Sequence, residues 1–164
     1  MMRNLPASLL IAAASAAKCP DLHQFRADSV LNGYDTSKMT GKWYEVAFED
    51  IAQVGAQCQT ETNTVTETGF EQHFKAKYVD KVLPFSQTYE YNANDLEDPN
   101  EVGMYTKWMK GAKAMLTLPT VIVDVQGDGD QYDYLIEFTC KNESPLIEVT
   151  ELRFSARESS ISDD

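Results

Sequence analysis

The sequence predicts an all-β protein, built either as a barrel or as a sandwich. Eight or nine short runs of alternating polarity are separated by turn residues at regular spacing, and no long stretch has helical periodicity. An antiparallel sheet must dispose of its edges, and full closure removes them completely. A closed barrel of about eight strands has room for side chains or for one small ligand. The 164 residues suit a single domain.

The first 17 residues have the layout of a secretory signal peptide. Arg3 lies in a short basic head, residues 5–14 form an apolar run, and small residues follow. The apolar run is shorter than the roughly 20 residues of a membrane span. We therefore expect export to a secreted or other extracytoplasmic location, with a single domain over residues 18–158 and a disordered tail over residues 159–164.

The composition is strongly acidic, with a formal net charge of -12 that becomes -13 once Arg3 leaves with the signal peptide. Such a surface repels phosphate backbones and anionic membranes, so neither nucleic acid nor a membrane surface is an expected partner. His23 and His73 have no metal-type partner at short spacing, and no phosphate-binding glycine loop or nucleophile motif is present. No cofactor, metal or catalytic residue is predicted.

Each expected strand is bounded by a turn signal. Asp35 and the Ser/Thr residues after it predict a short capped helical turn, Glu67-Thr68-Gly69 a hairpin, and Pro119 a bend or an edge position. The acidic segment 94–100 predicts a solvated loop, and Gly127-Asp128-Gly129-Asp130 predicts a turn. The expected strands are residues 43–48, 60–66, 70–78, 88–93, 102–108, 114–118, 120–125, 132–140 and 146–156.

Aromatic residues recur at alternate strand positions. In a closed barrel such positions point to the lumen or to the outside as a set, and they either line a ligand pocket or fill a narrow core. These candidate ligand-binding residues are Phe74, Tyr78, Tyr89, Tyr91, Trp108, Tyr134 and Phe138. Glu45 has the parity of Trp43; facing inward, its carboxyl would have a raised pKa and could act as an acid, but it could equally face solvent.

Several motifs carry a resemblance to a known family. Met39-Thr40-Gly41-Lys42-Trp43-Tyr44-Glu45 opens an apolar strand, Tyr132 to Cys140 is a Tyr-rich strand ending in cysteine, and Leu152 to Arg157 ends in Ala-Arg. In this order and spacing, residues 19–158 resemble a lipocalin, most closely the apolipoprotein D and bacterial lipocalin branch. One motif departs from the family pattern, because Gly129-Asp130-Gln131 stands where Thr-Asp-Tyr is usual.

The resemblance implies an eight-stranded antiparallel up-and-down barrel. It implies that Gly41, Trp43 and Arg157 are structural, with the guanidinium stacked across the indole at the closed end. It also pairs Cys19 with Cys140 in a disulfide that ties the N-terminal arm to the barrel wall. The helix that usually packs on a lipocalin barrel has no sequence to form from, so we expect it to be absent or minimal.

Cys58 is the odd cysteine of three. In the relatives its usual partner lies in a C-terminal extension, and three alternatives remain open here. The thiol is buried and inert, it forms an intermolecular bridge, or it is a reactive nucleophile. The protein would accordingly be a monomer or a dimer linked through Cys58.

The expected function is binding and transport of a small hydrophobic ligand, such as a fatty acid, retinoid, sterol, carotenoid or bilin, as the resemblance implies. An alternative is an enzyme on the same barrel with an activity similar to that of the xanthophyll de-epoxidases. A third possibility is an interaction module, whose rim contacts a protein receptor while its cavity is filled.

Overall fold

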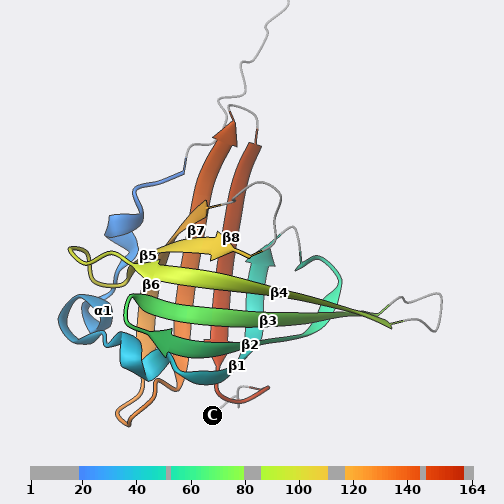
Figure 1. Cartoon of the computed structure of the whole chain (residues 1–164), viewed down its shortest axis with the longest axis horizontal. Helices are drawn as coiled ribbons and strands as arrows, with labels where there is room; N and C mark the ends of the chain where they lie inside the picture. Colours follow the sequence, from blue (N-terminus) through green and yellow to red (C-terminus); the bar gives the residue numbers. More distant parts are fainter. Residues whose placement is uncertain (1–18, 51–52, 80–85, 111–116, 145–146, 161–164) are drawn as a thin grey trace, which may run out of the picture.

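The computed structural model describes residues 19–50, 53–79, 86–110, 117–144 and 147–160. Eight antiparallel strands form a closed barrel, in which each strand pairs with its neighbours in sequence and β8 pairs with β1 (Figure 1). The predicted all-β, up-and-down barrel is therefore confirmed. The strands are β1 (Gly41–Asp50), β2 (Ala56–Thr66), β3 (Gly69–Val79), β4 (Ser86–Glu97), β5 (Met104–Met109), β6 (Thr117–Gln126), β7 (Tyr134–Ser144) and β8 (Ile147–Ala156).

Two expected boundaries are wrong. β4 continues through Glu97, so the first part of the segment predicted as a solvated loop is strand. The strand continues because Asp95 is buried inside the barrel, where its carboxylate lies 3.9 Å from the Lys107 ammonium. β6 is one continuous strand that includes Pro119. The strand tolerates the missing N–H of the proline because β6 pairs with β7 only from Thr120 onward.

The N-terminal segment lies against the outside and the closed end of the barrel (Figure 1). Its described part, from Cys19 onward, contains two 3-10 helices, η1 (Leu22–Phe25) and η2 (Thr36–Met39), and one short α-helix, α1 (Asp28–Gly33). The predicted capped turn is confirmed, because the Asp35 side chain accepts a hydrogen bond from the Ser37 amide. In the described residues no helix follows β8.

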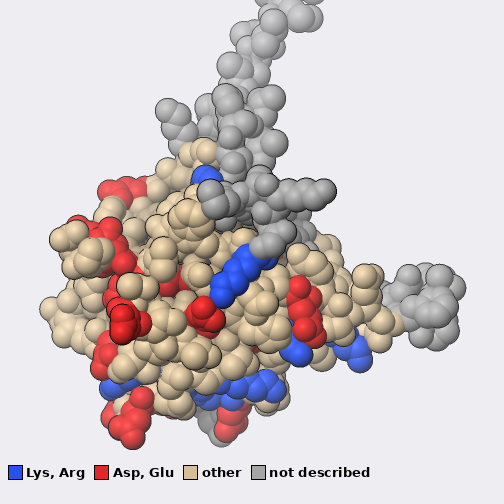
Figure 2. Space-filling model, viewed as in Figure 1, with Lys and Arg blue, Asp and Glu red and all other residues tan. Residues whose placement is uncertain are grey.

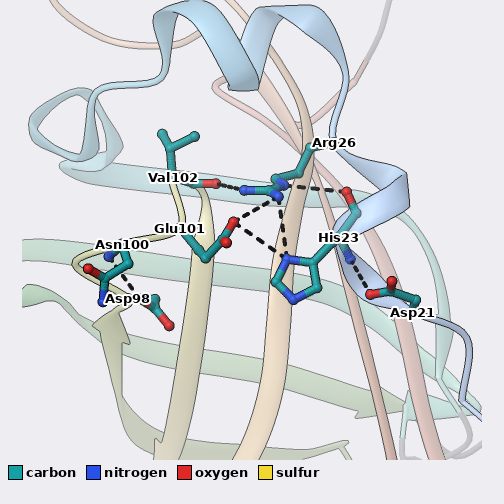
Figure 3. Close-up of polar contacts among 7 residues, drawn as sticks. All are labelled: Asp21, His23, Arg26, Asp98, Asn100, Glu101 and Val102. Carbon is teal, nitrogen blue, oxygen red and sulfur yellow. Dashed lines mark hydrogen bonds and ion pairs between the residues drawn. The ribbon is translucent and has the colours of Figure 1, made fainter.

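Arg26 fastens this segment to the loop between β4 and β5 (Figure 3). Its guanidinium donates to the Val102 carbonyl at 2.9 Å and to the Glu101 carboxylate at 3.0 Å. The same carboxylate lies 3.6 Å from the His23 ring. Because the Arg26 side chain is only 9% exposed, these contacts replace most of its lost hydration.

The closed end of the barrel is filled by an apolar core. Val30 of α1 and Met39 of η2 enter it from below, and both are fully buried. Residues of the strands, together with Tyr132 just before β7, complete this core. Its buried members are Val30, Met39, Trp43, Phe70, Tyr105, Ile122, Val125, Tyr132 and Leu135.

Acidic side chains are spread over the visible face of the molecule, with basic ones between them (Figure 2). Within the ranges that the structure describes, no helix is long and apolar enough to cross a membrane.

Gly69 is the glycine on which the barrel depends most. Its φ is +141°, and a Cβ added there would lie 2.0 Å from the Asp95 carbonyl oxygen. We expect Gly69→Ala to lower the free energy of unfolding by about 2 kcal/mol or more, because backbone must move in β3 or β4. Gly129→Ala is the control, since a Cβ there meets nothing within 4 Å. Denaturant unfolding of both variants measures the difference, and equal stabilities would contradict the expectation.

Candidate functional site

Trp43 and Arg157 close one end of the barrel. The Trp43 indole is fully buried and donates to the Met39 carbonyl at 2.9 Å. The Arg157 guanidinium carbon lies 3.5 Å from the centre of the Trp43 rings, which is the cation over a π face that the resemblance implies. This contact forms the floor of the site.

The guanidinium of Arg157 is also bonded on every nitrogen. It donates to the carbonyls of Tyr132 at 2.8 Å, Lys42 at 3.0 Å and Lys38 at 3.1 Å. A Cβ on Gly41, whose φ is +97°, would lie 3.3 Å from one of these nitrogens, which explains the glycine. The floor thus ties β1, β8 and the N-terminal segment together.

The predicted aromatic set does not share one face. Phe74 is buried inside the barrel and its ring stacks on Tyr91, with centroids 4.8 Å apart. Tyr78 lies on the same face of β3 as Phe74, nearer the end of the strand, and is partly exposed. Tyr89 shares the face of Tyr91 on β4 but is 53% exposed.

The other three aromatic residues lie on the outer face, so the structure does not bring them together with Phe74 and Tyr91. Trp108 alternates with the inward Lys107 on β5. Phe138 packs edge to face on Phe25 of the N-terminal segment, with centroids 5.2 Å apart. Tyr134 contacts Phe154 of β8 at 5.5 Å.

The face of the barrel that turns inward carries many polar and charged side chains. Each of them is at most 8% exposed, although carboxylates, amides and cations are rarely buried without partners. Sequence reasoning considered only Glu45 among them. The set is Glu45, Gln59, Glu61, Asn63, Gln72, Asp95, Lys107, Thr120, Glu137, Thr139, Arg153 and Ser155.

Arg153 of β8 is the centre of this polar group. Its guanidinium lies 3.2 Å from the Glu61 carboxylate of β2 and 2.8 Å from the Glu137 carboxylate of β7. Glu61 also accepts a hydrogen bond from the Gln72 amide at 2.8 Å. The two carboxylates raise the pKa of Arg153, so the guanidinium stays charged in spite of its burial.

Several polar atoms in the lumen have no hydrogen-bond partner in the part of the chain that the structure describes. Both carboxylate oxygens of Glu45 and both side-chain amide atoms of Asn63 are in this state. An unpartnered buried polar group costs roughly 1–3 kcal/mol. These atoms therefore mark positions where a ligand or ordered water would be bound.

Burial also changes the ionisation of the lumen carboxyls. It raises the pKa of Glu45 from 4.5 to about 8, an effect that Arg153 opposes and that Glu61 and Glu137 reinforce. Burial likewise raises the pKa of Asp95 to about 6, against the influence of Lys107. The Glu45 carboxyl is thus mostly neutral near pH 7, so it can donate a hydrogen bond or give up a proton when a ligand binds.

The predicted cystine is present, with Cys19 and Cys140 bonded at 2.08 Å. It lies outside the barrel wall and covers Val121 together with Leu22. Cys58 is free and exposed, so the buried form of that thiol is wrong, whereas the bridging and reactive forms stay predictions.

The comparisons with known proteins give a match in structure only. No protein-family model and no curated protein matches the sequence. The chain is similar in structure to lobster apocrustacyanin A1, with a TM-score of 0.59, 12% identity, and coverage of 91% of this chain and 76% of that one. It is also similar to insecticyanin of the tobacco hornworm Manduca sexta, with a TM-score of 0.56, 12% identity, and coverage of 80% and 67%.

A third similar structure is LTBP1, crystallised as a complex with LTC4. It has a TM-score of 0.57, 14% identity, and coverage of 92% of this chain and 86% of that one. Together with the closed barrel and its Trp43–Arg157 floor, these likenesses show that the protein has the lipocalin fold. The narrower placement in the apolipoprotein D branch stays a prediction.

The raised pKa of Glu45 predicts how stability depends on pH. The unfolded chain loses this proton near pH 4.5 and the folded protein near pH 8, so the unfolded state binds fewer protons between these values. The free energy of unfolding should therefore fall as the pH rises from about 5 to 8, by roughly 2–4 kcal/mol from this group alone.

Glu45→Gln should remove this share of the pH dependence, as measured by denaturant unfolding at several pH values. Glu49→Gln is the matched control, because Glu49 lies on the same strand but is exposed. An identical slope in the wild type and in Glu45→Gln would refute the assignment.

Proposed function

We propose that this protein binds and carries a small organic molecule inside its barrel. The observation that carries the proposal is the polar interior of the barrel, where buried polar atoms without hydrogen-bond partners among the described residues lie above a floor closed by Trp43 and Arg157. A solid core of this size would gain nothing from unsatisfied carboxylates and amides. Among the similar structures, that of LTBP1 was determined in complex with leukotriene C4.

The lining favours a ligand with an apolar part and at least one polar group. Phe74 and the stacked Tyr91 offer apolar surface, while Glu45, Asn63 and the Arg153 group offer hydrogen-bonding atoms. A purely hydrocarbon ligand would leave those polar atoms unpaired, at a cost to affinity. The hydrophobic ligands expected from the sequence fit this lining only where they carry such a group.

We also propose that the protein is exported. The Cys19–Cys140 disulfide is of the kind that persists in oxidising compartments, in agreement with the signal-peptide pattern of residues 1–17, which lie outside the described ranges. In such a compartment the exposed Cys58 thiol could link two copies, so both a monomer and a Cys58-linked dimer remain part of the proposal.

The test is whether the purified protein holds a ligand in the lumen. We expect native mass spectrometry to detect a bound small molecule, or titration with apolar and amphipathic compounds to quench tryptophan fluorescence. A Trp108→Phe variant leaves Trp43, at the floor, as the only indole of the two in the sequence. Phe74→Ala should weaken binding by about tenfold, and Phe138→Ala, on the outer face, should not. Failure of every ligand to bind would refute the proposal.

One observation favours an enzymatic alternative. Glu45 faces the lumen, and burial keeps its pKa near 8, so its carboxyl is a neutral acid at neutral pH. If the protein acted on carotenoid epoxides in the manner of a xanthophyll de-epoxidase, an added soluble two-electron reductant would supply the electrons, Glu45 would protonate the epoxide oxygen, and the oxygen would leave as water after a second proton from solvent. Turnover of an epoxy-carotenoid at low pH that is lost in Glu45→Gln would establish this activity, and the absence of turnover would exclude it.

A further inference from the structure

The charged side chains inside the barrel are not balanced. Among the described residues, four carboxyl groups inside the barrel are at most 8% exposed, those of Glu45, Glu61, Asp95 and Glu137. Two cations are buried with them, Lys107 and Arg153. Complete ionisation would leave two uncompensated negative charges in a low-dielectric interior, which is strongly unfavourable.

Each of the two buried cations lies within 4 Å of a carboxylate other than that of Glu45. Arg153 lies between the carboxylates of Glu61 and Glu137, at 3.2 and 2.8 Å. Lys107 lies 3.9 Å from Asp95. Glu45 is left over, since neither of its buried oxygens has a hydrogen-bond partner among the described residues.

The surroundings of Glu45 are charged but predominantly acidic. Among the described groups whose charges act most strongly on it, Arg153 is the cation, and three carboxyl groups oppose it. Two phenols also feel the charge of Glu45. The groups that face it are Arg153 and Glu151 of β8, Glu61 of β2, Glu137 of β7, Tyr78 of β3 and Tyr91 of β4.

We propose that Glu45 binds the cationic nitrogen of an organic amine, with the apolar part of the ligand against Phe74 and Tyr91. This inference rests on the proposed lumen binding and names the class of ligand. An ammonium group would supply the donors that the Glu45 oxygens lack, in a site where a charged hydrogen bond is strong. The stacked rings of Phe74 and Tyr91 offer apolar area and a π face to such a ligand.

A metal ion fits the site less well than an amine. Calcium needs six to eight oxygen ligands and magnesium near-octahedral coordination. In the described residues no group of three or more His, Cys, Asp or Glu side chains is placed to hold a metal. The net charge of -12 also favours the approach of a cation of any kind.

Binding of the amine should release a proton. Without ligand the Glu45 carboxyl holds its proton near pH 7, since its pKa is raised to about 8. A bound ammonium favours the carboxylate, so the proton passes to solvent as the ion pair forms. The Glu45 carboxylate and the bound ammonium together carry no net charge, as does the protonated Glu45 carboxyl without ligand.

The experiment compares three ligands of similar shape by calorimetry at pH 7: 2-phenylethylamine, 2-phenylethanol and 3-phenylpropanoate. The amine should bind at least about tenfold more tightly than the other two. Titration in two buffers of different ionisation enthalpy should show close to one proton released for each amine bound. Glu45→Gln should weaken amine binding by roughly 10- to 100-fold, abolish proton release and leave 2-phenylethanol binding unchanged.

Glu49→Gln serves as the control and should behave as the wild type. If the alcohol or the carboxylate binds as tightly as the amine, or if Glu45→Gln binds the amine normally, the inference is wrong while lumen binding stands. If none of the three binds and no other small molecule does, the proposed function itself fails. Amine binding without proton release would also overturn the role given to Glu45.

Discussion

The stacking of Arg157 on Trp43 determines which side chains enter the barrel. Trp43 is fully buried at the floor, and alternation along β1 then turns Glu45 to the same side. Cross-strand pairing carries this choice around the barrel, because Trp43 is opposite Glu61 on β2 and Glu45 is opposite Ser155 on β8. One cation–π contact, worth roughly 0.5–2 kcal/mol, thus holds Trp43 inside the barrel, and the strand register then determines which residues of the neighbouring strands point inward.

Folding alone does not account for the chemistry of the lumen. Arg153 forms a buried ion-pair group with Glu61 and Glu137. When apolar residues replace such a group, the protein is often as stable as before or more stable. The core below, with Trp43 and its apolar neighbours, already supplies dense packing. A polar interior above an apolar floor is therefore better explained by the binding of a molecule than by the stability of the chain.

Much of the fold could be predicted from the sequence, because turn residues and alternating strands are local signals. The hairpin at Gly69 was accessible in this way, whereas the floor of Trp43 and Arg157 and the Cys19–Cys140 bond were implied by the resemblance to the lipocalins. The facing of β7 was not recognised, although the disulfide contained it. An N-terminal arm outside the wall requires Cys140 to point outward, so Phe138 points outward and Glu137 inward. The hydrophobicity of Phe138 suggested instead that it points into the barrel. Its ring is buried on the outer face by Phe25.

Arg157, Arg153 and Lys107 have different roles, and none of them is hydrogen-bonded to Glu45. Arg157 donates to three backbone carbonyls at the closed end of the barrel. Arg153 forms ion pairs with two carboxylates, and Lys107 lies beside Asp95. Of the cations described inside the barrel, each forms its ion pairs with carboxylates other than that of Glu45. The Glu45 carboxyl can then be neutralised by a proton or by a ligand. Since a proton and a cationic ligand compete for the same oxygens, the occupancy of the lumen and the ionisation of Glu45 must be linked.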